Sequence, residues 1–494
     1  PEFALISLID ASPHAAGTAY VAATRYKLDD FTPYLYKTSD YGQSWQRITN
    51  GIPADEFTRV IREDPNRKGL LYAGTEKSVY VSFDDGAHWQ PFQQNLPVVP
   101  IHDLEIKGSD LIAATHGRGF WVVDDLTPIY QMQGGQSQTP VQLFQPRPTV
   151  QFKTNFGFGR GAATGNLYQM TGATMYTYRM EKNEQGEQER VNLDAGQNPP
   201  EGVVFRYSLA QVPEGEVELT ISDGQGQEIR GFSSKKAEGA PEAKPMVAGE
   251  SFEQMMEQAG VTEPEDKQEP KVPKAAGMNR FVWDMRYPGA VEVPGDLSMQ
   301  FVGGSRGPTA PPGTYTVTLT VNGQSESQTF ELVKDPRISA TEEDLQAQFA
   351  FLLRVRDKLS QTNEAINRIR TVREQIVGWG KRLAGKESGQ SVREIGKPLV
   401  RQLSEIEEQL IQVHAKSRQD TLNYPVMLNA KLAGLMRSAA SAFARPTDQS
   451  YAVFDDLSKQ VDAQLERLNN LLQSELPKFN QAVQQAQLPA VEAP

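Results

Sequence analysis

Two short segments of this 494-residue chain decide its fold: SDYGQSW at residues 39–45 and SFDDGAHW at residues 82–89. Both are assigned here to the pattern Ser-x-Asp-x-Gly-x-x-Trp, and the aspartates, Asp40 and Asp84, lie 44 residues apart. Each segment closes a β-rich stretch. A period of about 40 to 50 residues is the size of one four-stranded blade of a β-propeller, so the pattern predicts repeated antiparallel sheets.

The residue types of the pattern suit a tight turn between strands. A short carboxylate can accept backbone N–H bonds across the turn, and the glycine permits positive φ. The tryptophan is expected to fold under the loop and bury its ring against the next sheet along the chain. A catalytic role is the competing interpretation, and it accounts for the aspartate alone. We therefore expect a structural role for Ser39, Asp40, Gly42, Trp45, Ser82, Asp84, Gly86 and Trp89.

The repeat extends on both sides of these segments. YVAAT at 20–24 matches LYAGT at 71–75 with a spacing of 51, and LIAAT at 111–115 follows with a spacing of 40. In the third copy Leu126 replaces the glycine and no tryptophan follows. Residues 1–130 are therefore predicted to form the last blades of a propeller, about three in number. Three blades cannot close a ring, so we expect further blades upstream or in a separate chain.

The middle of the chain reads as a second β-rich region. Residues 131–150 are rich in Gly, Gln and Pro and are predicted to be a linker. Short strand-like runs separated by turn signals then predict an immunoglobulin-like β-sandwich over 151–338. Residues 234–276 are rich in Glu, Lys and Pro and are expected to form a flexible insertion, with a partner-docking segment as the alternative.

The C-terminal part is helical in character. TEED at 341–344 resembles a capping box, and four apolar stripes with a spacing of three to four residues follow it. The fourth stripe is expected to end at Pro477. The stripes predict an antiparallel helical bundle over 339–485, with a short tail at 486–494 and a partner-binding coiled coil as the alternative. The predicted fold class is thus multidomain β plus α.

Composition excludes several classes of chemistry. The chain has no cysteine, so disulfides, thiolate metal ligands and cysteine nucleophiles are ruled out. Five histidines form no metal-binding pair, and the glycine-rich residues 157–161 lack the ending of a phosphate-binding loop, so no metal and no cofactor are expected. The net charge of −12, without a basic block, argues against nucleic acid. No apolar run approaches the ~20 residues of a membrane span.

One loop is a candidate for ligand binding. Within THGRGFW at 115–121, His116 and Arg118 could bind an anionic group, and Trp121 belongs to the same candidate ligand loop. The alternative is an ordinary tight turn in which Arg118 pairs with Asp124 or Asp125.

Together, the Asp-boxes, THGRGFWVVDD at 115–125, NRFVWDMRYPG at 279–289 and PPGTY at 311–315 resemble one family. It is the family of bacterial sortilin-like (VPS10-like) propeller proteins with BNR repeats, often labelled glycosyl hydrolases. The resemblance implies a secreted, periplasmic or cell-surface protein that binds peptide, protein or glycan without catalytic residues in these 494 residues. The alternative that it implies is a sialidase-like or xyloglucanase-like glycoside hydrolase whose catalytic acids lie in upstream blades. Sialidase chemistry would require three arginines, and the spacing of the available ones singles out no trio: Arg25, Arg47, Arg59, Arg62 and Arg118.

Overall fold

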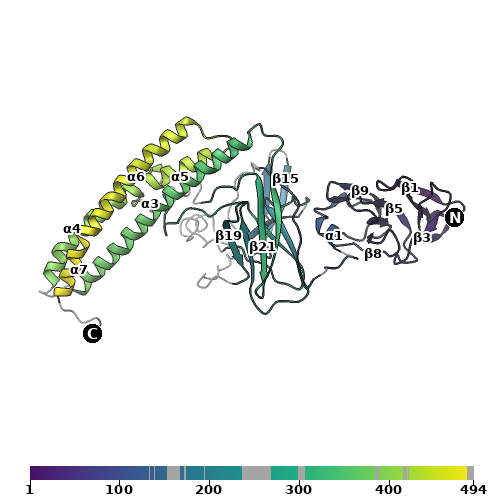
Figure 1. Cartoon of the computed structure of the whole chain (residues 1–494), viewed down its shortest axis with the longest axis horizontal. Helices are drawn as coiled ribbons and strands as arrows, with labels where there is room; N and C mark the ends of the chain where they lie inside the picture. Colours follow the sequence, from purple (N-terminus) through teal and green to yellow (C-terminus); the bar gives the residue numbers. More distant parts are fainter. Residues whose placement is uncertain are drawn as a thin grey trace.

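In a computed structural model the chain is long, with antiparallel sheets in its N-terminal and middle parts and helices in its C-terminal part (Figure 1). The structure describes residues 1–132, 134–137, 139–152, 167–171, 174–193, 195–235, 269–298, 306–383, 389–415, 420 and 422–486. Most of the predicted insertion, the glycine-rich residues 157–161 and the tail after residue 486 lie outside these ranges. None of the described helices has the length and apolar composition of a membrane span.

Three antiparallel sheets form the N-terminal part, one for each sequence repeat. The first two have four strands and the third has three. Their strands are β1 (Leu5–Ala11), β2 (Ala19–Arg25), β3 (Asp30–Thr38), β4 (Gln46–Arg47), β5 (Thr58–Glu63), β6 (Leu71–Thr75), β7 (Val79–Ser82), β8 (Gln90–Pro91), β9 (Ile101–Lys107), β10 (Asp110–Thr115) and β11 (Phe120–Val123). One apolar core lies between the first and second sheets and another between the second and third, so the described sheets are stacked side by side.

The first strands of the three sheets meet, because β5 contacts both β1 and β9. Arg62 on β5 joins them: it donates to Asp10 on β1 over 3.1 Å, and to Asp103 on β9 over 2.9 Å. Its Nε also donates to the carbonyl of Leu104 over 2.8 Å. A single side chain thus connects all three repeats.

Strand pairing corrects the sequence alignment of the first repeat by one residue. Tyr36 lies two residues before Thr38, and Tyr80 lies two residues before Ser82; Thr38 and Ser82 supply the hydroxyl groups of the two turns. Tyr36 pairs with Val21, and Tyr80 pairs with Ala73. The structural spacing is therefore 52 rather than 51 residues. The small residues of YVAAT and LYAGT match in either register, but a slip of one residue moves a side chain to the other face of the sheet.

Two sheets in the middle of the chain share one hydrophobic core. One has the order β12-β17-β20, the other β13-β22-β21-β18-β19, and a third, smaller sheet has the order β14-β15-β16. The strands are β12 (Val141–Leu143), β13 (Thr149–Gln151), β14 (Leu167–Thr171), β15 (Thr174–Lys182), β16 (Gln188–Asn192), β17 (Val203–Leu209), β18 (Val217–Ser222), β19 (Glu228–Ser233), β20 (Gly277–Trp283), β21 (Gly313–Val321) and β22 (Gln324–Lys334). Trp283, Phe205 and Phe281, all fully buried, fill the centre of the core.

The prediction that residues 131–150 form a linker is wrong where the segment contributes to a helix and two strands. Helix α1 (Thr127–Gln131) enters it, β12 pairs with β17, and β13 pairs in parallel with β22. These strands were not predicted because each has only three residues and the surrounding segment is rich in Gly, Gln and Pro. The segment therefore belongs to the sheets of the middle part.

The C-terminal helices are α3 (Glu342–Arg382), α4 (Gln390–Leu410), α5 (Leu428–Ala439), α6 (Asp448–Ser474) and α7 (Leu476–Gln485). The predicted capping box is confirmed: the Thr341 hydroxyl accepts from the Asp344 N–H, and the Asp344 carboxylate accepts from the Thr341 N–H. Helix α6 ends at Ser474, close to the predicted end of the fourth stripe, and Pro477 lies in the first turn of α7, where proline is tolerated. The apolar stripes of these helices face one core.

An extended segment, residues 288–296, lies along α3 and is called the strap below. Side chains of α3 donate hydrogen bonds of 2.6–3.0 Å to its backbone carbonyls. The pairs are Arg356 with Pro288, Asn363 with Val291, Asn367 with Glu292, and Arg370 with Pro294. Ala290 and Val293 of the strap are buried in the helical core. The strap thus fastens the helices to the end of the middle sheets.

Candidate functional site

The second turn is held by one carboxylate and one hydroxyl. Asp84 accepts the His88 N–H over 2.8 Å and the Ser82 hydroxyl over 2.9 Å, and the His88 ring Nδ1 lies 2.7 Å from its other oxygen. The Gly86 N–H donates to Ser82 over 2.9 Å, and Gly86 adopts φ of 86°. Ser82, Asp84 and His88 thus contribute their polar groups to the folding of the turn.

The first turn repeats this geometry, with one correction. Asp40 accepts the Ser44 N–H over 2.9 Å and the Ser44 hydroxyl over 2.6 Å. The hydroxyl that bonds both Asp40, at 2.8 Å, and the Gly42 N–H, at 2.9 Å, belongs to Thr38. Ser39 is exposed instead. The prediction for Ser39 is therefore wrong, because Thr38 offers the same oxygen at the position of Ser82.

Both turn carboxylates are held ionised. Hydrogen bonds from Ser44, first its hydroxyl and then its N–H, lower the pKa of Asp40 to about 2. Burial acts against ionisation at Asp84, but the hydrogen bonds from His88 and Ser82 outweigh it and lower the pKa of Asp84 below its ordinary value. Such acids accept hydrogen bonds and are poorly suited to donate a proton in catalysis.

The two tryptophans differ. Trp89 is 5% exposed, as expected, but it packs against the preceding repeat and not the next one: its ring N–H donates to the Ile48 carbonyl over 2.8 Å. Trp45 is 46% exposed. The expectation of burial is wrong for Trp45, because no described sheet lies in front of the first repeat to receive the ring.

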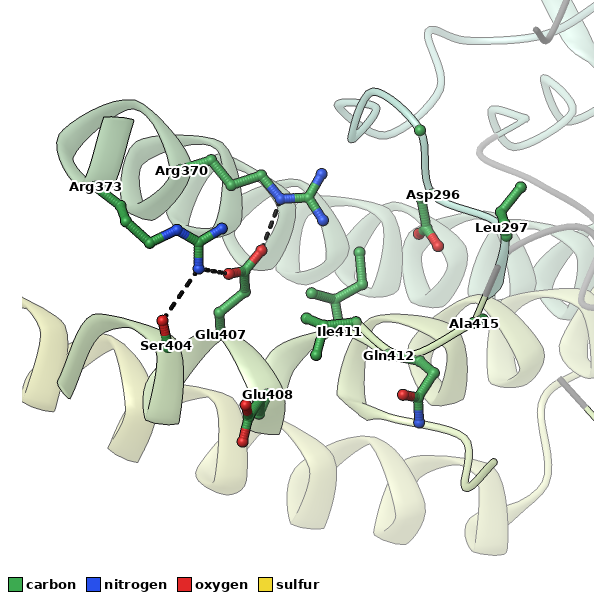
Figure 2. Close-up of a pocket in the computed structure, with 12 residues that line it drawn as sticks. Asp296, Leu297, Arg370, Arg373, Ser404, Glu407, Glu408, Ile411, Gln412 and Ala415 are labelled. Carbon is green, nitrogen blue, oxygen red and sulfur yellow. Dashed lines mark hydrogen bonds and ion pairs between the residues drawn. The ribbon is translucent and has the colours of Figure 1, made fainter. Parts of the chain in front are cut away.

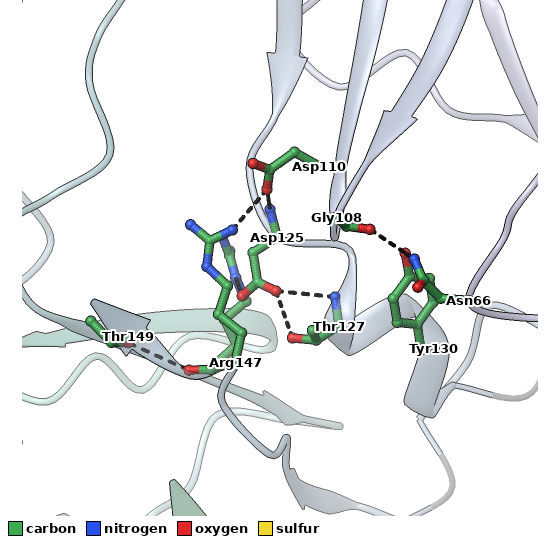
Figure 3. A network of polar contacts seen from close by, with 9 residues as sticks. Asn66, Gly108, Asp110, Asp125, Thr127, Tyr130, Arg147 and Thr149 are labelled. Atoms are coloured by element: carbon green, nitrogen blue, oxygen red, sulfur yellow. Dashed lines mark hydrogen bonds and ion pairs between the residues drawn. The ribbon is translucent and has the colours of Figure 1, made fainter. Parts of the chain in front are cut away.

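The degenerate third copy forms the junction with the middle sheets (Figure 3). Asp125 adopts φ of 71° and accepts the Thr127 N–H over 3.1 Å, which starts helix α1. Asp110 accepts the Asp125 N–H and the Arg147 guanidinium, over 2.9 and 2.8 Å. Arg206 of β17 lies 3.8 Å from Asp125. Asp125 is engaged at this junction, and the described contact of the Arg118 guanidinium is to the Gly117 carbonyl, so the considered pairing of Arg118 with Asp124 or Asp125 is not found.

The hairpins β2–β3, β6–β7 and β10–β11 lie at one end of the three sheets, beside the starts of β5 and β9. We call this end the hairpin face. It brings together aromatic, cationic, imidazole and acidic side chains from all three repeats. They are Tyr26, Lys27, Phe31, Phe57, Arg59, Glu76, His102, His116 and Arg118.

Its aromatic part is built around Phe57. Tyr26 stacks on Phe57 with ring centroids 5.0 Å apart, and Phe31 lies 6.0 Å from the same ring. The Arg59 guanidinium lies over both the Tyr26 and Phe57 rings, at 5.6 and 5.1 Å. Arg59 also donates to Glu76 over 2.6 Å. The rings and the cation therefore hold one another in place.

The predicted loop residues divide into two groups. His116 and Arg118 are exposed, and among the described residues the guanidinium of Arg118 donates to the Gly117 carbonyl alone, over 3.2 Å. Trp121 instead packs against the core between the second and third sheets and donates its ring N–H to the Arg118 carbonyl over 3.1 Å. Trp121 thus supports the loop, and His116 and Arg118 remain available to a ligand.

The sequence analysis missed Arg59 and His102 as members of this face. Each is the second residue of the first strand of its sheet, β5 and β9. The sequence could have identified both residues only if β5 and β9 had been aligned as the first strands of equivalent sheets. His102 stacks on His116 with centroids 4.9 Å apart and planes inclined by 24°.

Burial, and then the positive charges of Arg59 and His116, lower the pKa of His102, while Glu76 acts in the opposite direction. The imidazole is therefore neutral at pH 7. On the same face, Glu76 is paired with Arg59, and Asp55 lies 3.0 Å from Lys77. The hydrogen bond from Lys77 lowers the pKa of Asp55.

Acids with raised pKa lie away from the hairpin face. Burial raises the pKa of Asp64, which accepts from the Asn66 N–H and the Tyr72 hydroxyl. Burial and the neighbouring Asp110 raise the pKa of Asp124 at the junction. Across the described ranges, no cluster of three or more His, Asp or Glu side chains could hold a metal ion.

Four of the five arginines considered for sialidase chemistry have partners elsewhere. Arg25 pairs with Asp30, and Arg62 with Asp10 and Asp103. Arg47 donates to a backbone carbonyl, and Arg59 pairs with Glu76. The geometry therefore assembles no arginine trio.

A cavity of about 270 Å³ lies between α3, α4 and the end of the strap (Figure 2). Glu407, which is 2% exposed, accepts from both Arg370 and Arg373 of α3. Arg373 also donates to Ser404 over 3.2 Å. Because the buried carboxylate is neutralised from two sides, this cluster acts as a link between the helices.

Comparisons with known proteins add little to this picture. No family model and no curated protein matches the chain. Among solved structures, YCF48 bound to D1 peptide is 17% identical over 41% of this chain and 60% of its own, with a TM-score of 0.18. An ancestral GH74 enzyme is 12% identical over 48% of this chain and 39% of its own, with a TM-score of 0.20.

The GH74 xyloglucanase from Xanthomonas campestris is 13% identical over 66% of this chain and 38% of its own, with a TM-score of 0.19. The chain thus spans between 38% and 60% of these structures, less than two thirds of each. TM-scores this low support no conclusion about fold or function, so the resemblance to sortilin-like proteins stays a prediction.

Proposed function

We propose that the chain is a non-catalytic binding protein that takes a peptide, protein or glycan on its hairpin face. One observation carries the proposal: aromatic and cationic side chains from three repeats converge there, and His116 and Arg118 are left exposed. As the family resemblance implies, we further propose that it is a bacterial protein that works outside the cytoplasm, in the periplasm, at the cell surface or in secreted form.

The face is suited to binding because its groups are already ordered. The Tyr26 and Phe57 rings stack, and Arg59 is fixed over them by Glu76. A ligand would not have to pay the full entropy of ordering these side chains, which otherwise costs about 0.5–1.5 kcal/mol each.

Glycoside hydrolysis is less well supported. It requires two carboxyl groups flanking the scissile bond, one of them protonated. On the hairpin face, Glu76 and Asp55 are each paired with a cation. The acids that the alternative needs would have to come from outside the hairpin face.

We also propose that the three sheets are blades of a propeller, followed by an immunoglobulin-like sandwich and a helical bundle, and that further blades cover both outer flanks. Val79 and Val81 of β7 are 3% and 2% exposed because the third sheet covers them. By strand pairing, Phe120 and Val122 hold the same positions in the third sheet and are 79% and 51% exposed.

The outer side of the first sheet also exposes apolar side chains: Ile6 and Ile9 of β1 are 51% and 65% exposed. Hydrogen–deuterium exchange tests the role of both flanks. In the chain alone, amides of β11 should exchange faster than those of β7, and addition of upstream repeats should slow them. Equal protection of β7 and β11 in the chain alone would contradict this proposal.

The binding function is tested by selecting ligands for the full chain from a random peptide library and a glycan array. Arg118→Ala and His116→Ala should lose the selected ligands. Arg401→Ala, at an 82% exposed arginine of α4, is the control and should keep them. Identical selections by all three variants would disprove binding at the hairpin face, and turnover of aryl glycosides or xyloglucan by the chain would favour the hydrolase.

A further inference from the structure

We infer that the hairpin face selects acidic peptides, and that the stacked pair His102–His116 makes their binding tighter as the pH falls. This rests on the proposed binding function of that face. It adds the charge of the ligand and a dependence on protons.

The two imidazoles come from separate elements and meet at the surface. His102 is the second residue of β9. His116 lies in the β10–β11 hairpin, where its backbone N–H donates to the Pro100 carbonyl over 2.9 Å. Both side chains are exposed, with ring centroids 4.9 Å apart. A ligand can therefore reach the pair directly.

The charged groups around the pair are predominantly positive. Arg59 and Glu76 act on His102, and Arg118 follows His116 by two residues in the same hairpin. Glu76 is bonded to Arg59, so its charge is already compensated. In the free protein, two imidazolium ions at this separation would repel each other, and Arg59 would repel that of His102.

A carboxylate placed on the pair reverses this balance. It supplies the missing negative charge, so protonated imidazole is favoured in the complex and disfavoured in the free protein. Binding is then linked to proton uptake, and a shift of one pKa unit between the free and bound states changes the affinity about tenfold. Histidine is suited to this because it titrates near neutral pH.

The apolar neighbours favour a peptide over an acidic glycan. Beside the pair, Phe57 is 5% exposed and stacks with Tyr26, so that part of the face is an ordered apolar surface. The exposed groups beside it are Leu28 and Phe31, at 51% and 48%. These match an apolar side chain next to an acidic residue.

The test uses three fluorescein-labelled hexapeptides with the same three apolar residues and either three aspartates, three asparagines or three lysines. Oligogalacturonate is the acidic glycan probe. Fluorescence anisotropy with the full chain is measured at pH 5.5 and 7.5. We expect the aspartate peptide to bind about tenfold more tightly at pH 5.5, and the asparagine and lysine peptides to bind weakly at both.

His102→Gln and His116→Gln should each flatten the pH dependence, and Arg118→Gln should weaken binding at both pH values. His88→Gln, at the opposite end of the second sheet, should retain the full dependence. Equal affinity for the aspartate and asparagine peptides, or tight binding of oligogalacturonate alone, would overturn the inference. Binding of neutral peptides that Arg118→Gln abolishes would overturn it too, but would leave the proposed binding function intact.

Discussion

The two turns at residues 38–45 and 82–89 share a sequence pattern but not a surrounding. In both, a carboxylate accepts the N–H four residues on and a hydroxyl accepts the glycine N–H. Trp89, however, is 5% exposed and Trp45 is 46% exposed. The turn is thus a local structure that each repeat forms alone, while burial of the tryptophan depends on the sheet before it.

The largest expected effect separates the two tryptophans. Trp89→Ala removes a ring packed on the first repeat and should lower the free energy of unfolding of the N-terminal sheets by about 3–5 kcal/mol. Trp45→Ala should cost far less, because its ring is already half in water. Urea unfolding followed by circular dichroism measures both. Equal losses of stability would contradict the prediction, because they would show that Trp45 contributes as much as the buried Trp89.

A smaller effect separates Thr38 from Ser39. Thr38→Ala leaves the Gly42 N–H without its acceptor and should cost about 1–3 kcal/mol in the same measurement. Thr38→Ser should retain most of the stability, and Ser39→Ala should change almost nothing. If Ser39→Ala were the more damaging variant, the structural assignment of the first turn would be wrong.

The smallest effect is the pH dependence of the first turn. The pKa of Asp40 is about 2 in the folded chain, below the ~3.9 of an unfolded aspartate. The stabilisation is therefore complete above about pH 4 and is lost as the pH falls toward 2. Asp40→Asn should flatten the slope of urea midpoint against pH between 4 and 2. An unchanged slope would show that the Ser44 hydrogen bonds do not favour the ionised form.

The sequence predicted what is local and repeated. Asp40, Asp84 and their glycines could be placed because a turn needs only neighbouring residues, and the helical stripes follow from a short period. Thr38 was missed because serine was assumed where either hydroxyl serves. The strands within 131–150 were missed because each has three residues and pairs with a distant partner.

The candidate site was predicted in part for a similar reason. His116 and Arg118 lie in one conspicuous loop, so the sequence identifies them. Arg59 and His102 join them only through the side-by-side packing of β5 and β9, which brings together residues 43 positions apart. No short sequence motif could therefore have predicted that Arg59 and His102 lie close together.

The strap along α3 sets a rule for how this sequence can diverge. Helix α3 contacts the carbonyl oxygens of the strap, and every residue type supplies a carbonyl. Most substitutions at its exposed positions therefore leave these bonds intact. A one-residue insertion or deletion would displace several carbonyls from their partners at once. In divergent relatives, the length of this segment should be inherited more strictly than the identity of its residues.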